Sequence, residues 1–160
     1  GMYAGVYHWF PKMYGRMMNK GLGYLHFWGT FICAYGVFFP MHFLGLAGLP
    51  RRYYQNSSFP MFDGLTDINA VITFFALAGA VFQFIFIFNF FYSIFKGTKA
   101  SKNPWQANTL EWTTPVERIH GNWPGELPTV HRWAYDYSKP GADKDFILQT
   151  EPLKEGEKEH

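Results

Sequence analysis

The sequence predicts an all-α membrane protein with two full transmembrane helices, the end of a preceding one, and a largely irregular polar C-terminal tail. Residues 21–50 and 68–95 contain no Asp, Glu, Lys or Arg. Each run exceeds the roughly 20 apolar residues that a helix needs to cross a bilayer. The tail after position 96 is polar, so the whole chain is only 48% hydrophobic. The distribution of apolar residues therefore decides the class, and their average does not.

The preceding helix is expected at residues 1–10, which are apolar and aromatic and come before the first basic side chains. A cleavable signal peptide has the opposite order, with positive charge before the apolar run. We therefore expect residues 1–10 to be the end of a transmembrane helix and the chain to be truncated at its N-terminus. Pro11 begins a basic turn that extends over residues 11–20.

The first full helix is expected over residues 21–50, because the residue before a proline avoids the helical region and Pro50 therefore stops the helix. A loop at 51–65 leads to the second full helix at 66–96. The tail, 97–160, contains six prolines, and we expect little regular structure in it.

Basic residues set the expected orientation, because cytoplasmic loops carry an excess of Lys and Arg. The turn at 11–20 and the start of the tail share one side of the membrane, which we expect to be cytoplasmic, and the loop at 51–65 then lies outside. The basic residues of the cytoplasmic side are Lys12, Arg16, Lys20, Lys96, Lys99 and Lys102.

Small or polar residues recur at helical spacing along both full helices, which predicts close packing within a larger bundle. Cys33 lies within the first of these seams, so we interpret it as a buried structural residue. The first seam is His26, Gly29, Cys33, Gly36 and Pro40, and the second is Asn69, Thr73, Ala76, Ala80 and Gln83.

Arg51 and Arg52 are the candidate binding residues. A basic pair on the outer side opposes the charge rule, which suggests a specific anionic partner. Paired guanidinium groups suit bidentate carboxylate or phosphate recognition, and Pro40 is expected to bend the helix so that the following loop points over the bundle. The alternative is that both are interfacial arginines that bind lipid headgroups.

Several other chemistries find no support in the residues. His26 and His42 are sixteen positions apart, and the histidines of the tail have no ligand spacing, so we assign no metal site and no catalytic residue. The net charge of +2 is too small to suggest binding to nucleic acid. A channel subunit would need polar side chains repeated around a pore, and the seams contain too few.

Five strings of residues closely resemble the C-terminal part of subunit I of haem-copper cytochrome c oxidase. They are HWFPKMYGRMMN at 8–19, LHFWGTF at 25–31, FFPMHFLGLAGLPRRY at 38–53, NTLEWTTP at 108–115 and ELPTVHRWAYDYS at 126–138. The PRRY string and the tail are more similar to cytochrome c oxidases than to quinol oxidases. The resemblance covers nearly the whole chain.

The resemblance implies a part of the catalytic subunit of a proton-pumping terminal oxidase, which oxidises cytochrome c and reduces oxygen to water. It implies that Arg51 and Arg52 contact haem propionates in the intact subunit. The haem and copper ligands of the family come from earlier helices, so this segment alone is expected to bind no cofactor and to be inactive.

The implied partners are the remainder of subunit I, oxidase subunits II and III, cytochrome c and the lipid bilayer. The implied location is the bacterial inner (plasma) membrane, with a cytoplasmic tail. The rival hypothesis is a stand-alone two-helix scaffold or assembly protein derived from that subunit.

Overall fold

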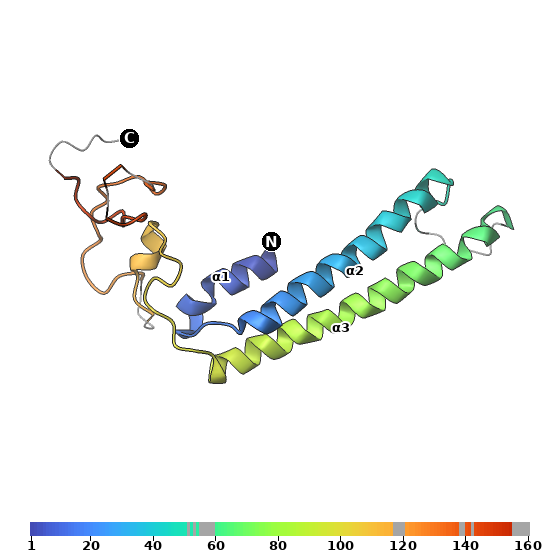
Figure 1. The fold of residues 1–160 in the computed structure, drawn as a ribbon, viewed down its shortest axis with the longest axis horizontal. Coiled ribbons are helices and arrows are strands. Elements are labelled where there is room, and N and C mark those ends of the chain that lie inside the picture. The colour runs from blue at the N-terminus through green and yellow to red at the C-terminus, as the bar shows by residue number, and fades with distance from the viewer. Residues whose placement is uncertain are drawn as a thin grey trace. The chain divides into compact units, whose positions relative to one another are not determined.

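The structure is a computed structural model that describes residues 1–50, 52, 54, 60–116, 121–137, 140–141 and 143–154. Within these residues the regular elements are helices and no β-strand forms, which confirms the predicted fold class (Figure 1). The helices are α1 (Met2–Tyr14), α2 (Lys20–Leu46), the 3-10 helix η2 (Pro60–Leu65), α3 (Thr66–Lys96) and the 3-10 helix η3 (Leu110–Thr113).

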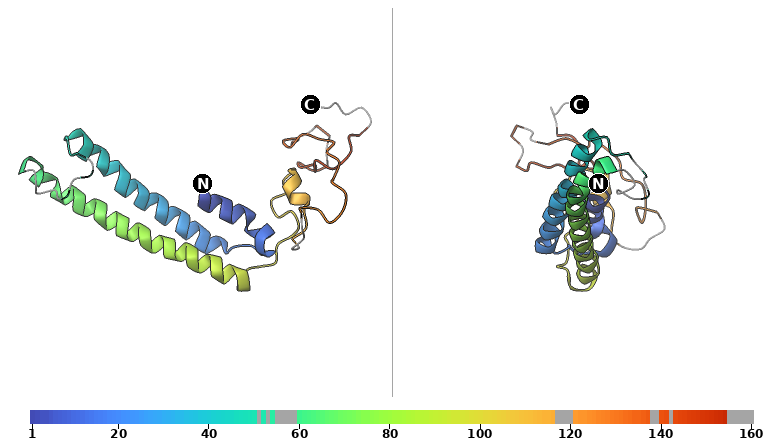
Figure 2. Two further views of the ribbon diagram at one scale, coloured as in Figure 1. Left: turned by 180° about the vertical axis from the view of Figure 1, so that it is seen from behind. Right: turned by 90° about the vertical axis from the view of Figure 1, so that its right-hand side faces the viewer.

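The chain divides into two compact units. One unit combines Gly1–Met18 with Lys96–His160, and the other is Asn19–Phe95. The second unit holds the two apolar helices, and both are long and apolar enough to cross a membrane. In this unit α2 and α3 lie side by side, as the left view of Figure 2 and the contacts of Gly29 and Gly36 with rings of α3 show.

Helix α1 continues past the predicted end at residue 10 and includes Pro11. It stops after Tyr14 because Gly15 adopts a left-handed conformation, with φ of 64°, and its N–H donates to the Pro11 carbonyl at 2.9 Å. The proline lacks an N–H and so forgoes one helical hydrogen bond, which the helix tolerates here. The glycine, and not the proline, therefore sets the end of α1.

Close approach between α2 and α3 depends on two glycines of α2. A Cβ atom at Gly29 would lie 2.2 Å from ring atoms of Phe82, and one at Gly36 would lie 2.4 Å from the ring of Phe75. Both distances are far below van der Waals contact, so each phenyl ring fills the space that a glycine leaves open. This confirms the predicted contact role of the α2 seam, in which Cys33 is also buried.

The predicted seam of α3 does not meet α2 at its three central small residues, and its packing within a larger bundle stays a prediction. Thr73, Ala76 and Ala80 are exposed in this unit, and the face of α3 that meets α2 instead carries Phe75 and Phe82. Small residues were expected at the contact on both helices. At this contact α2 has small residues, and the large rings of α3 pack against them. Complementary volume, which fills the contact without a gap, decides the pairing.

The tail is irregular, as predicted, apart from η3, yet it has a buried polar centre. Arg132 and Asp136 are each only 5% exposed, and Nη1 of the arginine lies 3.2 Å from Oδ2 of the aspartate. The same guanidinium donates through Nε to the Glu151 carbonyl at 2.9 Å and through Nη2 to the Pro152 carbonyl at 2.8 Å. A charged pair with this many hydrogen bonds fixes the path of the surrounding backbone without regular secondary structure.

Candidate functional site

The candidate binding residues follow the end of α2, where the backbone forms a defined stop. Gly48 adopts a left-handed conformation, with φ of 88°. The N–H of Leu49 donates to the Leu44 carbonyl at 3.0 Å, and the N–H of Gly48 donates to the Gly45 carbonyl at 3.1 Å. These two bonds are the Schellman arrangement that closes a helix. The helix therefore ends at Leu46, before the predicted stop at Pro50, because the glycine turns the chain first.

Arg52 lies six residues beyond this helix end. Its side chain is exposed, and its φ of 59° places a non-glycine residue in the left-handed region. Such a conformation costs roughly 1–2 kcal/mol for a residue with a Cβ atom, and costs of this kind often occur at functional positions. No acidic side chain of the described ranges pairs with its guanidinium. Arg51, the other predicted site residue, lies outside the residues that the structure describes.

A polar group lies between the two apolar helices. His26 is 3% exposed, and its Nε2 lies 3.4 Å from Oε1 of Gln83. The amide of Gln83 donates to Oγ1 of Thr30 and to the Gly79 carbonyl, each at 3.1 Å. His26 therefore lies at the helix contact, as its place in the predicted seam of α2 indicated, and its ring nitrogen faces the side-chain amide of Gln83.

A second polar group joins the start of α2 to the end of α3. Asn89 and Ser93 are fully buried, and both accept hydrogen bonds from the N–H of Asn19 at 3.2 Å. In return, Nδ2 of Asn89 donates to the Asn19 carbonyl at 3.1 Å, and the Ser93 hydroxyl donates to Oδ1 of Asn89 at 3.0 Å. Oδ1 of Asn19 caps α2 by accepting from the N–H of Leu22 at 3.0 Å. The group locks the two helices at one end.

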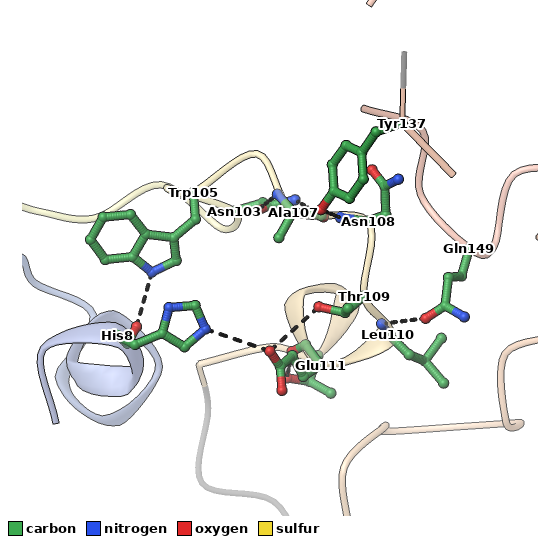
Figure 3. A network of polar contacts seen from close by, with 11 residues as sticks. His8, Asn103, Trp105, Ala107, Asn108, Thr109, Leu110, Glu111, Tyr137 and Gln149 are labelled. Carbon is green, nitrogen blue, oxygen red and sulfur yellow. Dashed lines mark hydrogen bonds and ion pairs between the residues drawn. The ribbon is translucent and has the colours of Figure 1, made fainter. Parts of the chain in front are cut away.

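In the other unit, α1 and η3 meet through an aromatic cluster around His8 (Figure 3). The indole N–H of Trp105 donates to the His8 carbonyl at 2.9 Å, and the two rings stack with centroids 5.8 Å apart. Nε2 of His8 lies 3.7 Å from Oε1 of Glu111. The ring of Trp112, itself only 2% exposed, meets His8 edge-on. His8 therefore holds Trp105 and η3 against α1 through ring packing and polar contacts.

Lys12 completes this cluster. Its ammonium donates to the Thr114 carbonyl and lies 5.6 Å from the centroid of the Trp112 ring. Partial burial lowers the pKa of Lys12, and the negative charge of Glu111 raises it in part. The ammonium of Lys12 therefore makes contacts within its unit. The lysines at the start of the tail are exposed instead.

Just before η3, the fully buried side-chain amide of Asn108 organises the tail. The side chain of Asn108 donates to the Asp136 carbonyl at 2.8 Å and accepts from the N–H of Ile147 at 2.9 Å. The N–H of Leu110 donates to Oε1 of Gln149 at 2.9 Å, which Figure 3 shows beside the His8 cluster. The sequence reasoning missed this network. No local pattern indicates it, because Asn108 bonds to Asp136 and Ile147, which are far along the chain.

In the described part of the chain, no three His, Cys, Asp or Glu side chains lie close enough to hold a metal ion.

Comparison with known sequences decides the family. The profile described as Cytochrome C and Quinol oxidase polypeptide I matches residues 1–78. The "Alternative cytochrome c oxidase subunit 1" of Bradyrhizobium diazoefficiens is 50% identical over 151 residues, which cover 93% of this chain. The chain belongs to the family of oxidase subunit I.

Two further members of the oxidase subunit I family give the same picture. The "Cytochrome c oxidase subunit 1" of Thermostichus vulcanus is 44% identical over 86% of this chain, and that of Synechocystis is 44% identical over 95% of it. The chain spans 24–26% of the length of these three relatives. It therefore corresponds to one segment of an oxidase subunit I.

Proposed function

We propose that this chain is the C-terminal segment of the catalytic subunit of a proton-pumping terminal oxidase, which oxidises cytochrome c and reduces oxygen to water. Its own part in that activity is to pack helices in the subunit and to contact the haem propionates through Arg51 and Arg52. The observation that supports this role is the exposed guanidinium of Arg52, which follows a helix end fixed by the Schellman motif at Gly48.

The donor set fits a carboxylate ligand. A guanidinium group is permanently charged and presents parallel N–H donors that match a carboxylate, and such charge-assisted bonds are stronger than neutral ones. Arg52 has no acidic partner among the described side chains, so its charge is available to a propionate. When bound, haem supplies the redox-active iron, and the arginines supply positive charge that holds the carboxylates in place.

Copper and haem iron need ligands from elsewhere in the subunit. The role proposed for this segment is limited to the propionate end of the cofactor. In this proposal His26 contributes to helix packing, because its ring nitrogen already faces the amide of Gln83.

The proposed location is the bacterial inner (plasma) membrane, with the tail on the cytoplasmic side. The proposed partners are the remainder of subunit I, subunits II and III, and cytochrome c. The relatives named above are cytochrome c oxidase subunits, which supports cytochrome c, and not a quinol, as the electron donor.

The test is to purify the protein from its native membranes with an antibody against the tail and to measure its haem spectrum and oxygen consumption. Reduced cytochrome c and a reduced quinol are supplied in separate assays. We expect a haem-containing complex that consumes oxygen with cytochrome c. A haem-free assembly with no oxygen consumption would contradict the proposal and favour a membrane scaffold instead.

A further inference from the structure

The backbone after α1 is joined directly to the backbone after α3. The N–H of Met17 donates to the Thr98 carbonyl at 2.8 Å, and the N–H of Ala100 donates to the Gly15 carbonyl at 2.9 Å. Arg16 and Lys99 therefore face each other in an isolated antiparallel bridge. Nη1 of Arg16 also donates to the Gly97 carbonyl at 2.6 Å. These bonds hold a short segment of the tail in a fixed position within its unit.

This fixed segment carries positive charge without acidic partners. Lys96, Lys99 and Lys102 are exposed, and none of them forms an ion pair with a described residue. With Arg16 they form what we call the basic platform. Residues 1–18 and 96–110 contain no Asp or Glu. Arg16 bonds to a neutral carbonyl, which leaves its charge uncompensated, so the platform brings four basic residues onto two short segments that are hydrogen-bonded to each other.

Helix α3 ends at Lys96, the first lysine of the platform in sequence. Its 31 residues span about 46 Å at the rise of an α-helix, whereas the hydrocarbon core of a bilayer is about 30 Å thick and the headgroups bring it to about 40–45 Å. Lys96 is the last residue of this helix, and Phe91 and Phe95 are exposed on the turns before it. An apolar surface that ends in a group of lysines matches the boundary between acyl chains and headgroups.

We propose that the basic platform binds the phosphate of an anionic phospholipid headgroup. Lysines immediately beyond a transmembrane helix attract anionic lipid electrostatically, and each contributes to the affinity. The antiparallel bridge keeps the backbone of Arg16 beside that of Lys99, so these two basic residues are neighbours before a lipid binds, which distinguishes the site from a mobile basic tail. The site is independent of the oxidase activity proposed above.

The experiment uses the full-length protein that contains this chain, in nanodiscs of phosphatidylcholine with increasing phosphatidylglycerol. Native mass spectrometry counts the phosphatidylglycerol molecules that the protein retains. The triple variant K96Q/K99Q/K102Q should need roughly a hundredfold more phosphatidylglycerol for equal retention. The K96R/K99R/K102R variant should behave as the wild type, and so should the control K144Q, which removes an exposed charge farther along the tail.

Three outcomes would overturn the proposal. One is equal retention of phosphatidylglycerol by the wild type and the Gln triple variant. A second is release of the bound lipid by millimolar inorganic phosphate, which would indicate a site for the free ion. A third is loss of another protein subunit with lipid retention unchanged, which would indicate a protein partner. Because lysines also influence insertion, the single variant K99Q is measured too, with protease access to the tail as the check on orientation.

Discussion

Substitution of Gly29 by alanine tests how α2 and α3 pack. The added Cβ atom would lie 2.2 Å from Cδ1 and Cε1 of Phe82, whereas carbon atoms in contact are about 3.5–4.0 Å apart. The ring must therefore move by more than about 1 Å or the helices must separate. Overpacking of this kind costs about 1–3 kcal/mol.

Gly45→Ala is the matched control, because Gly45 is in the same helix and a Cβ atom added there would have no other atom within 4 Å. Alanine favours a helix over glycine by up to about 1 kcal/mol, and both variants receive this gain. The free energy of unfolding should therefore be about 1–3 kcal/mol lower in Gly29→Ala than in Gly45→Ala. The assay is unfolding of the purified full-length protein in mixed micelles with increasing SDS, followed by circular dichroism.

The double variant G29A/F82A makes the test specific to one contact. Removal of the Phe82 ring opens the space that the new methyl group needs, so the two changes should couple by about 0.5–3 kcal/mol. Equal stability of Gly29→Ala and Gly45→Ala, or strict additivity in the double variant, would refute this packing of α2 against α3.

Three other substitutions give separate predictions. Asn89→Ala removes the hydrogen bonds that its amide exchanges with the N–H and the carbonyl of Asn19 and should cost about 1–3 kcal/mol in the same unfolding assay; an unchanged midpoint would contradict the network. Gly48→Ala forces a Cβ atom into a left-handed conformation and should cost about 1 kcal/mol; a more stable variant would contradict the Schellman end of α2. Glu111→Gln removes the charge that raises the pKa of Lys12, so that pKa should fall further, measured from the pH dependence of Lys12 acylation by mass spectrometry; a rise would be inconsistent with the cluster.

The fold class was accessible from the sequence because apolar length alone predicts membrane helices. The uncharged run at 21–50 predicted α2 without any knowledge of its partner. The exact ends were less accessible, since two turn signals compete at each end. Gly15 ends α1 after Pro11, and Gly48 ends α2 before Pro50. In both places a left-handed glycine, and not the nearby proline, set the boundary.

The partner face of α3 could not be predicted from residue size on that helix alone. Phe82 fits only because Gly29 on the other helix leaves a space, so the property belongs to the pair. The small residues Ala76 and Ala80 were predicted to belong to a packing seam, and both are exposed in this unit.

The tail shows a different limit of sequence reasoning. Its prolines correctly predicted irregular backbone, but irregular chain can still enclose a polar centre. Arg132 and Asp136 are four residues apart, which is the spacing of neighbours on a helix, but they are not in a helix. Such contacts depend on bonds to Glu151 and Pro152, which are too distant in sequence for a local pattern to indicate.

The arginine pair carries the central functional claim, and a redox titration of the haem tests it most directly. Arg51→Gln, Arg52→Gln and the control Lys144→Gln are each made in the full-length oxidase. A positive charge beside the propionates favours the reduced haem, so each arginine variant should lower the haem midpoint potential, by an amount on the order of tens of millivolts. The control should leave it unchanged. A midpoint potential unaffected in both arginine variants would contradict the proposed propionate contact.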